Sequence, residues 1–142
     1  MIFEKYPAPV KDDLTPLSDA AGEVVSLGPN ARRWKTGDKV IPVCLPDWIG
    51  GRQRPGKFRN MGNADDGVLQ EYMIVEEQAL VSMPVKYSFA EGSTLACAAP
   101  TAWNALTGLK RVGPGDWVLT QGTGGVSIFA IQVSSFHGQT QV

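Results

Sequence analysis

A glycine-rich segment, QGTGGVS at positions 121–127, limits the possible folds of this chain more than any other feature. It follows a short apolar run, Trp117–Thr120, and precedes residues whose apolar members recur at helical spacing. A strand, a glycine turn and a helix in this order predict a dinucleotide-binding unit, in which the helix start holds a pyrophosphate. A tight turn without a ligand would need similar glycines, so the neighbouring sequence has to decide between the two. The candidate cofactor-binding residues of the turn are Gly122, Thr123, Gly124, Gly125 and Val126.

Short β-prone runs separated by turn residues make up much of the chain between Gly22 and about residue 85. Branched and aromatic residues favour pleated strands, whereas the Gly, Pro, Asn and Asp between them favour turns. A small antiparallel barrel or meander is therefore predicted. The predicted strands are Glu23–Leu27, Lys39–Val43, Val68–Val75 and Leu80–Met83, with a long glycine-rich loop over residues 46–67.

Helical signals begin at Ser88, which together with Glu91 three residues later matches a capping box. A helix is predicted over Phe89–Cys97, and Pro100 suits the first turn of a second helix that ends at Gly108. A third helix is predicted after the glycine turn, with apolar residues at i, i+3, i+4 and i+7. These residues are Val126, Phe129, Ala130 and Val133.

The overall charge and the hydropathy argue against two classes of partner. Thirteen basic and 14 acidic side chains give a net charge of −1, which favours neither nucleic acid nor an anionic membrane surface. Because no apolar run reaches the roughly 20 residues of a membrane span and no signal peptide is evident, a cytoplasmic location is expected. Cys44 and Cys97 are too far apart for a structural zinc motif and are interpreted as reduced thiols.

The glycine-rich loop also carries a local cluster of positive charge. Such a cluster could attract a cofactor phosphate or nucleic acid. Because no RNA-binding motif accompanies it, a solvated basic loop is the favoured interpretation. The cluster consists of Arg52, Arg54, Lys57 and Arg59.

Five segments, in order along nearly the whole chain, carry a family resemblance. They are PLSDAAGEVVSLG, WKTGDKV, DDGVLQEYMIVEEQAL, YSFAEGSTLACAAPTAWNAL and GPGDWVLTQGTGGVSIFAIQ. The chain resembles the zinc-independent, alcohol dehydrogenase-like and quinone oxidoreductase-like branch of the medium-chain dehydrogenase/reductases. This resemblance implies a mixed β and α/β fold, a GroES-like partial β-barrel followed by the first strand–turn–helix of a truncated Rossmann domain. It implies an N-terminally incomplete barrel domain at residues 1–88 and the start of an NAD(P)-binding domain at 89–142.

The resemblance also implies an activity, in which NAD(P)H exchanges a hydride with a small alcohol, carbonyl, quinone or enone. Thr101 aligns with a threonine that lies beside the nicotinamide ring in relatives. Alternatively, its hydroxyl satisfies a backbone N–H at a helix start. Trp48 occupies the loop that borders the substrate cleft in relatives, although a lone loop aromatic is also typical of a packing anchor.

A catalytic zinc is not expected. Zinc-using relatives carry Gly-His-Glu where this chain has Leu17-Ser18-Asp19, so a serine replaces the histidine ligand. The four closely spaced cysteines of a structural zinc site are also missing. No replacement electrophile is evident, and no catalytic residue is assigned. His137, the single histidine, is expected to be solvated or to cap the third helix.

Two hypotheses of different class remain open. In the first, the chain is an oxidoreductase by ancestry; in the second, it is a non-catalytic truncated product or an interaction module that self-associates through exposed sheet edges. The residue that reads the ribose 2′ position would fall about 20 residues after the glycines, so the choice between NAD and NADP is not decided. The isolated chain is expected to bind NAD(P)H weakly or not at all and to be inactive.

Overall fold

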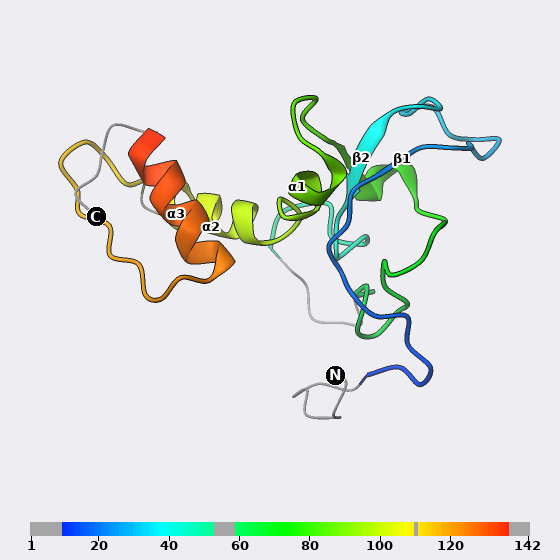
Figure 1. The fold of residues 1–142 in the computed structure, drawn as a ribbon, viewed down its shortest axis with the longest axis horizontal. Coiled ribbons are helices and arrows are strands. Elements are labelled where there is room, and N and C mark those ends of the chain that lie inside the picture. The colour runs from blue at the N-terminus through cyan, green and yellow to red at the C-terminus, as the bar shows by residue number, and fades with distance from the viewer. Residues whose placement is uncertain (1–9, 53–58, 110, 137–142) are drawn as a thin grey trace. The chain divides into compact units, whose positions relative to one another are not determined.

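The computed structural model describes residues 10–52, 59–109 and 111–136 (Figure 1). The chain forms two compact units, Met1–Ser93 and Thr94–Val142. The boundary between the two units therefore lies after Ser93, at the end of the short helix Phe89–Ser93, which the sequence analysis assigns to the second domain. The assignment of residues 1–88 to a barrel domain and 89–142 to a cofactor domain stays a prediction.

The first unit is built on a three-stranded antiparallel sheet in the order β1-β2-β3 (Figure 1). Its strands are β1 (Gly22–Glu23), β2 (Lys39–Pro42) and β3 (Leu80–Ser82). The register pairs Gly22 with Val40, and Ile41 with Val81. A turn at Gly37, which has a φ of 91°, leads into β2, and its N–H donates to the Val24 carbonyl at 2.8 Å.

The central strand β2 supplies the core of this unit. Val40 and Ile41 are buried, as are Ala79 and Leu80 beside them. Ala79 ends a short 3-10 helix, η1 (Glu77–Ala79), that leads directly into β3. Burial of these apolar side chains is the main force that holds the sheet together.

The helix α1 (Phe89–Ser93) follows the sheet and starts at the predicted capping box. The Ser88 hydroxyl and backbone N–H both donate to Glu91 Oε2, at 2.7 and 2.9 Å, and the Glu91 N–H donates back to Ser88 Oγ at 3.3 Å. Gly92 lies against Met83, because a Cβ at Gly92 would come within 2.5 Å of the Met83 sulfur. The prediction of a helix through Cys97 was wrong, since α1 ends at Ser93 and turns follow.

Three of the predicted strands in the first unit end earlier than expected, and β3 is one of them, because it ends at Ser82 rather than Met83. Strand β1 ends at Glu23 rather than Leu27, and Val25 and Leu27 are exposed. Strand β2 ends one residue early, at Pro42. Propensity alone does not extend a strand beyond the residues that find a partner in the sheet.

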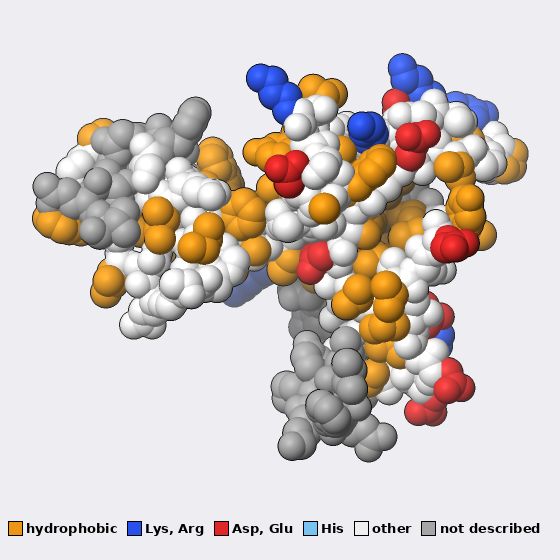
Figure 2. Space-filling view, viewed as in Figure 1, with side chains coloured by type: hydrophobic (Ala, Val, Ile, Leu, Met, Phe, Trp, Pro, Cys, Tyr) orange, Lys and Arg blue, Asp and Glu red, His pale blue; other side chains and the backbone are white. Residues whose placement is uncertain are grey.

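The predicted strand Val68–Val75 is not a strand in the structure. The backbone N–H groups of Val68 and Leu69 donate to the carbonyls of Leu17 and Pro16, but the residues after Leu69 are irregular. Tyr72 and Ile74 are exposed, and Figure 2 shows hydrophobic side chains gathered on the surface of this unit. The residue types are right for a strand, but a neighbouring strand is missing in the described part of the chain.

The second unit contains a pair of packed helices, α2 (Ala98–Thr107) and α3 (Gly125–Phe136). Ala102 and Leu106 of α2 are buried, and the Gly108 N–H caps the end of α2 by donating to the Asn104 carbonyl at 2.8 Å. None of the helices within the described ranges is long and apolar enough to cross a membrane.

The predicted strand Trp117–Thr120 is present only as an isolated bridge position at Trp117. Trp117 and Leu119 are exposed, whereas Val118 between them is half-buried. Without strands beside it among the described residues, the run cannot form a ladder.

Candidate cofactor and substrate sites

The glycine turn before α3 has the backbone geometry that the sequence predicts. Gly122 has a φ of 77°, a conformation that side chains with a Cβ rarely adopt. A Cβ at Gly124 would meet no atom within 4 Å, so the space above this residue is open. Gly125 differs, because a Cβ there would lie 3.3 Å from the Ala98 Cβ at the start of α2.

Backbone N–H groups are exposed where the glycine turn leads into α3. The first hydrogen bond of the helix runs from the Ile128 N–H to the Gly124 carbonyl at 3.0 Å, and Ser127 Oγ donates to the Gln121 carbonyl at 3.0 Å. Within the described part of the chain, the N–H groups of Gly125 and Val126 have no hydrogen-bond acceptor. Free N–H groups and the helix dipole together favour an anion at this end of the helix.

Five of the six predicted cofactor-binding residues therefore lie together, exposed, on the glycine turn and the first residues of α3. Thr123 and Val126 are exposed beside the three glycines. The binding of a cofactor by these residues stays a prediction.

Thr101 lies in the second turn of α2 and is exposed. Its Oγ1 donates to the Cys97 carbonyl at 2.8 Å, and its backbone N–H donates to the same oxygen at 3.1 Å. The hydroxyl thus donates to a backbone carbonyl, and its alternative role, accepting from a backbone N–H at the helix start, stays a prediction. Contact with a nicotinamide ring stays a prediction.

Trp48 lies on a loop of the first unit and is 44% exposed. Its backbone N–H donates to the Leu45 carbonyl at 3.0 Å, and its indole Nε1–H donates to the Gly51 carbonyl at 3.1 Å. The ring is thus tied to its own loop rather than buried in the core, which does not favour the packing-anchor interpretation. Ile49 beside it is 70% exposed.

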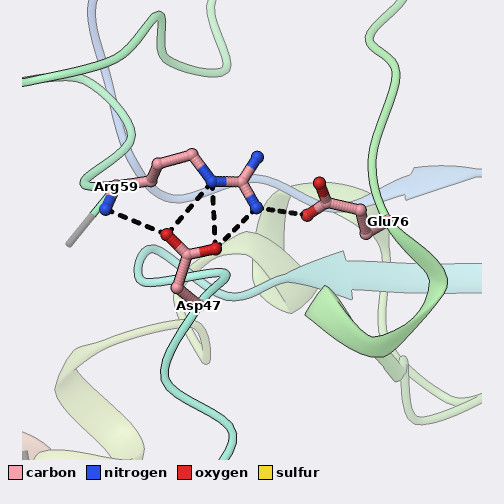
Figure 3. A network of polar contacts seen from close by, with 3 residues as sticks. All are labelled: Asp47, Arg59 and Glu76. Atoms are coloured by element: carbon pink, nitrogen blue, oxygen red, sulfur yellow. Dashed lines mark hydrogen bonds and ion pairs between the residues drawn. The ribbon is translucent and has the colours of Figure 1, made fainter.

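A network of charged side chains joins Asp47, next to Trp48, to Arg59 later in the loop and to Glu76 beyond it (Figure 3). The Arg59 guanidinium donates to both oxygens of Asp47, from Nε at 3.0 and 3.1 Å and from Nη2 at 2.7 Å. The same Nη2 donates to Glu76 Oε2 at 2.5 Å, and the Arg59 backbone N–H donates to Asp47 at 3.2 Å. Sequence reasoning missed this network, although acidic residues on both sides of the basic cluster were a signal for it.

The network shifts the pKa values of Asp47 and Arg59. Hydrogen bonds from the Arg59 side chain and backbone lower the pKa of Asp47, and hydrogen bonds to Asp47 and then Glu76 raise the pKa of Arg59. Arg59 is therefore a paired cation, although its side chain stays 44% exposed to solvent. Arg54, Lys57 and His137 lie outside the described residues.

The segment in the place of the relatives' zinc ligand carries few groups that could bind a metal. Ser18 Oγ donates to Asp19 Oδ2 at 3.2 Å, so the pair offers a hydroxyl and a single carboxylate. Zinc sites need at least three protein ligands of the Cys, His or carboxylate type. Within the described residues, no three His, Cys, Asp or Glu side chains come together as such a group. The donor set at Ser18 does not fit zinc.

Leu17, beside this pair, has a strained backbone. Its φ is 74°, a left-handed conformation that disfavours residues with a Cβ, and its side chain is 51% exposed. Three backbone N–H groups hold the segment in place. Gly67 donates to Thr15 at 2.6 Å, Val68 to Leu17 at 2.9 Å and Leu69 to Pro16 at 3.1 Å.

Comparison with known proteins assigns the family. Residues 1–85 match the family described as the alcohol dehydrogenase GroES-like domain, and the chain belongs to this family. A crystal structure of a candidate alcohol dehydrogenase from Sinorhizobium meliloti superposes with a TM-score of 0.86 at 37% identity, over 94% of this chain and 40% of that one. The resemblance to alcohol dehydrogenase-like and quinone oxidoreductase-like proteins and the GroES-like fold of the first part of the chain are thus confirmed.

Two curated relatives show the range of the family. A zinc-type alcohol dehydrogenase-like protein of Schizosaccharomyces pombe is 40% identical over 138 residues, which are 94% of this chain and 39% of that protein. A chloroplastic quinone-oxidoreductase homolog of Spinacia oleracea is 36% identical over 140 residues, 94% of this chain and 37% of that protein. The chain therefore spans less than half the length of these relatives.

Proposed function

We propose that this chain provides the catalytic-barrel part and the pyrophosphate-binding turn of a zinc-independent, NAD(P)H-dependent oxidoreductase. The reaction is hydride transfer between the nicotinamide and a small alcohol, carbonyl, quinone or enone. The observation that carries the proposal is the glycine turn at α3, with a left-handed Gly122 and open space at Gly124. Membership of the alcohol dehydrogenase family supports the reaction class.

Each group of candidate residues would have a separate task. The N–H groups at the start of α3 would hold the pyrophosphate, and open space at Gly124 would let it approach the backbone. Thr101 would contact the nicotinamide, and Trp48 would border the substrate. The cofactor, when bound, would donate the hydride to a carbonyl, quinone or enone, or accept it from an alcohol.

The zinc-independent part of the proposal depends on ligand chemistry. One relative is named zinc-type, whereas the spinach relative is named a quinone-oxidoreductase homolog and a structural neighbour is named an enoyl reductase. The hydroxyl of Ser18 and the carboxylate of Asp19 provide too few suitable ligands for zinc, which favours chemistry without the metal. Protein purified without added metal or chelator should contain far less than one zinc per chain, and a stoichiometric amount would refute this part.

Cofactor binding is tested with glycine-selective ¹⁵N labelling of the 142-residue polypeptide and titration with NADPH and NADH. The amides of Gly122, Gly124 and Gly125 should shift selectively. Affinity should be weak, in the millimolar range or about −4 kcal/mol, because this turn provides contacts to the pyrophosphate only.

The matched variants are Gly124→Val and Gly28→Val. A Cβ meets no atom within 4 Å at either glycine, and neither has a positive φ, so neither change should unfold the chain. Gly124→Val should abolish the shifts, whereas Gly28→Val should keep them. Equal responses of the two variants would count against a pyrophosphate site at this turn.

A further inference from the structure

The loop that carries Trp48 is anchored more firmly than its exposed position requires. Asp47 immediately precedes Trp48, and Arg59 binds the Asp47 carboxylate through three side-chain hydrogen bonds (Figure 3). The partly exposed side chains of this network have 40–46% of their surface accessible. Exposed ion pairs contribute little to stability, but a forked Arg–carboxylate pair fixes geometry.

Contacts on both sides of Trp48 fix the direction in which its ring points. Asp47 is fixed by Arg59 on one side of Trp48, and Gly51, with a φ of 74°, accepts the indole N–H on the other side. With its single polar group already bonded within the loop, the indole has only its apolar ring to offer to solvent. Ile49 adds a second apolar side chain beside it.

We propose that Arg59 is a positioning residue, which holds Asp47 so that Trp48 presents its ring face to a planar, uncharged ligand. The ligand class rests on the proposed function, in which Trp48 borders the substrate. The positioning role itself rests on the contacts among Asp47, Arg59 and Glu76. Glu76 accepts a second hydrogen bond from the same Nη2 atom, which further restrains the Arg59 guanidinium beside Asp47.

The test uses the full chain labelled with 5-fluorotryptophan and recorded by ¹⁹F NMR without any ligand. The chain has four tryptophans, and the Trp48 resonance is assigned by its loss in Trp48→Phe. In Arg59→Met the Trp48 resonance should shift and broaden. The Trp34 resonance should stay in place, because its indole bonds to the Glu77 carbonyl in the same unit.

Conservative variants separate positioning from a general loss of structure. Arg59→Lys keeps the charge but lacks the fork that binds both Asp47 oxygens, so it should restore the Trp48 resonance only in part. Asp47→Asn should reproduce the effect of Arg59→Met. The urea midpoint should be nearly unchanged in all three variants.

Two outcomes would overturn the proposal. In the first, the Trp48 resonance of Arg59→Met is the same as in the wild type. In the second, the Trp48 and Trp34 resonances change together with a large fall in the urea midpoint, which indicates a general structural role. Since no cofactor or substrate is present, neither outcome depends on whether the proposed oxidoreductase function is correct.

Discussion

Replacement of Gly67 by alanine should be among the most damaging small changes in the first unit. An alanine Cβ would lie 2.5 Å from the Pro16 carbonyl oxygen and closer still to the Leu17 carbonyl oxygen. Both neighbours are backbone atoms, which cannot rotate away as a flexible side chain can. The segment around Leu17 would therefore have to separate from residues 67–69.

The cost of this separation follows from the hydrogen bonds that join the two segments. Three backbone hydrogen bonds, donated by Gly67, Val68 and Leu69, would be lost or distorted. At about 1 kcal/mol each, the loss is about 3 kcal/mol. This is a large part of the roughly 5–15 kcal/mol that stabilises a domain.

Urea unfolding of Gly67→Ala and of the control Gly28→Ala measures this difference. Gly28 has no positive φ and open space around it, so its change should stay within about 0.5 kcal/mol. With an m-value of about 1.5 kcal/mol per molar, Gly67→Ala should lower the urea midpoint by about 2 M. Equal midpoints for the two variants would refute the argument that residues 15–17 and 67–69 are packed against each other.

Two further predictions concern strain and acid. Leu17→Gly should raise the free energy of unfolding by up to about 1 kcal/mol in urea titrations. The strain energy released at the left-handed leucine exceeds the entropic cost of the more flexible glycine. Leu17→Val should lower the free energy of unfolding. The pKa of Glu77 is lowered from 4.5 by backbone N–H groups of Arg32 and Arg33, so its stabilising effect is complete above about pH 4.5 and is lost as pH falls through the lower folded pKa. Urea midpoints should accordingly fall less steeply below pH 4.5 in Glu77→Gln than in the wild type, and identical acid slopes would contradict this.

Features that depend on neighbouring residues in the sequence could be predicted well. The capping box at Ser88 and Glu91 uses side chains three positions apart, and the structure has the predicted bonds. The left-handed Gly122 follows from the turn itself. Strand lengths could not be predicted, because residues such as Val25 and Ile74 need a partner that the local sequence does not specify.

The candidate sites show the same difference between local features and contacts among distant residues. The glycine turn is contiguous and was found from its spacing, whereas the Arg59 network joins residues that are 12 and 17 positions apart. Charge alone suggested that Arg59 is solvated, because the count of basic residues in a loop does not reveal which carboxylates face them. The strain at Leu17 was likewise hidden, although the glycine of zinc-using relatives at this position was a clue to its backbone.

The contact between Gly125 and Ala98 bears on how the glycine turn would recognise a ligand. The two residues lie so close that the packing of α2 and α3 determines where the helix start lies before anything binds. A binding turn that is already ordered loses little conformational entropy when a ligand binds, because that entropy was lost when the protein folded. Calorimetric titration with a pyrophosphate-containing ligand should thus reveal little entropic penalty from the turn, and enlarging the side chain at Ala98 would disturb recognition without touching the ligand.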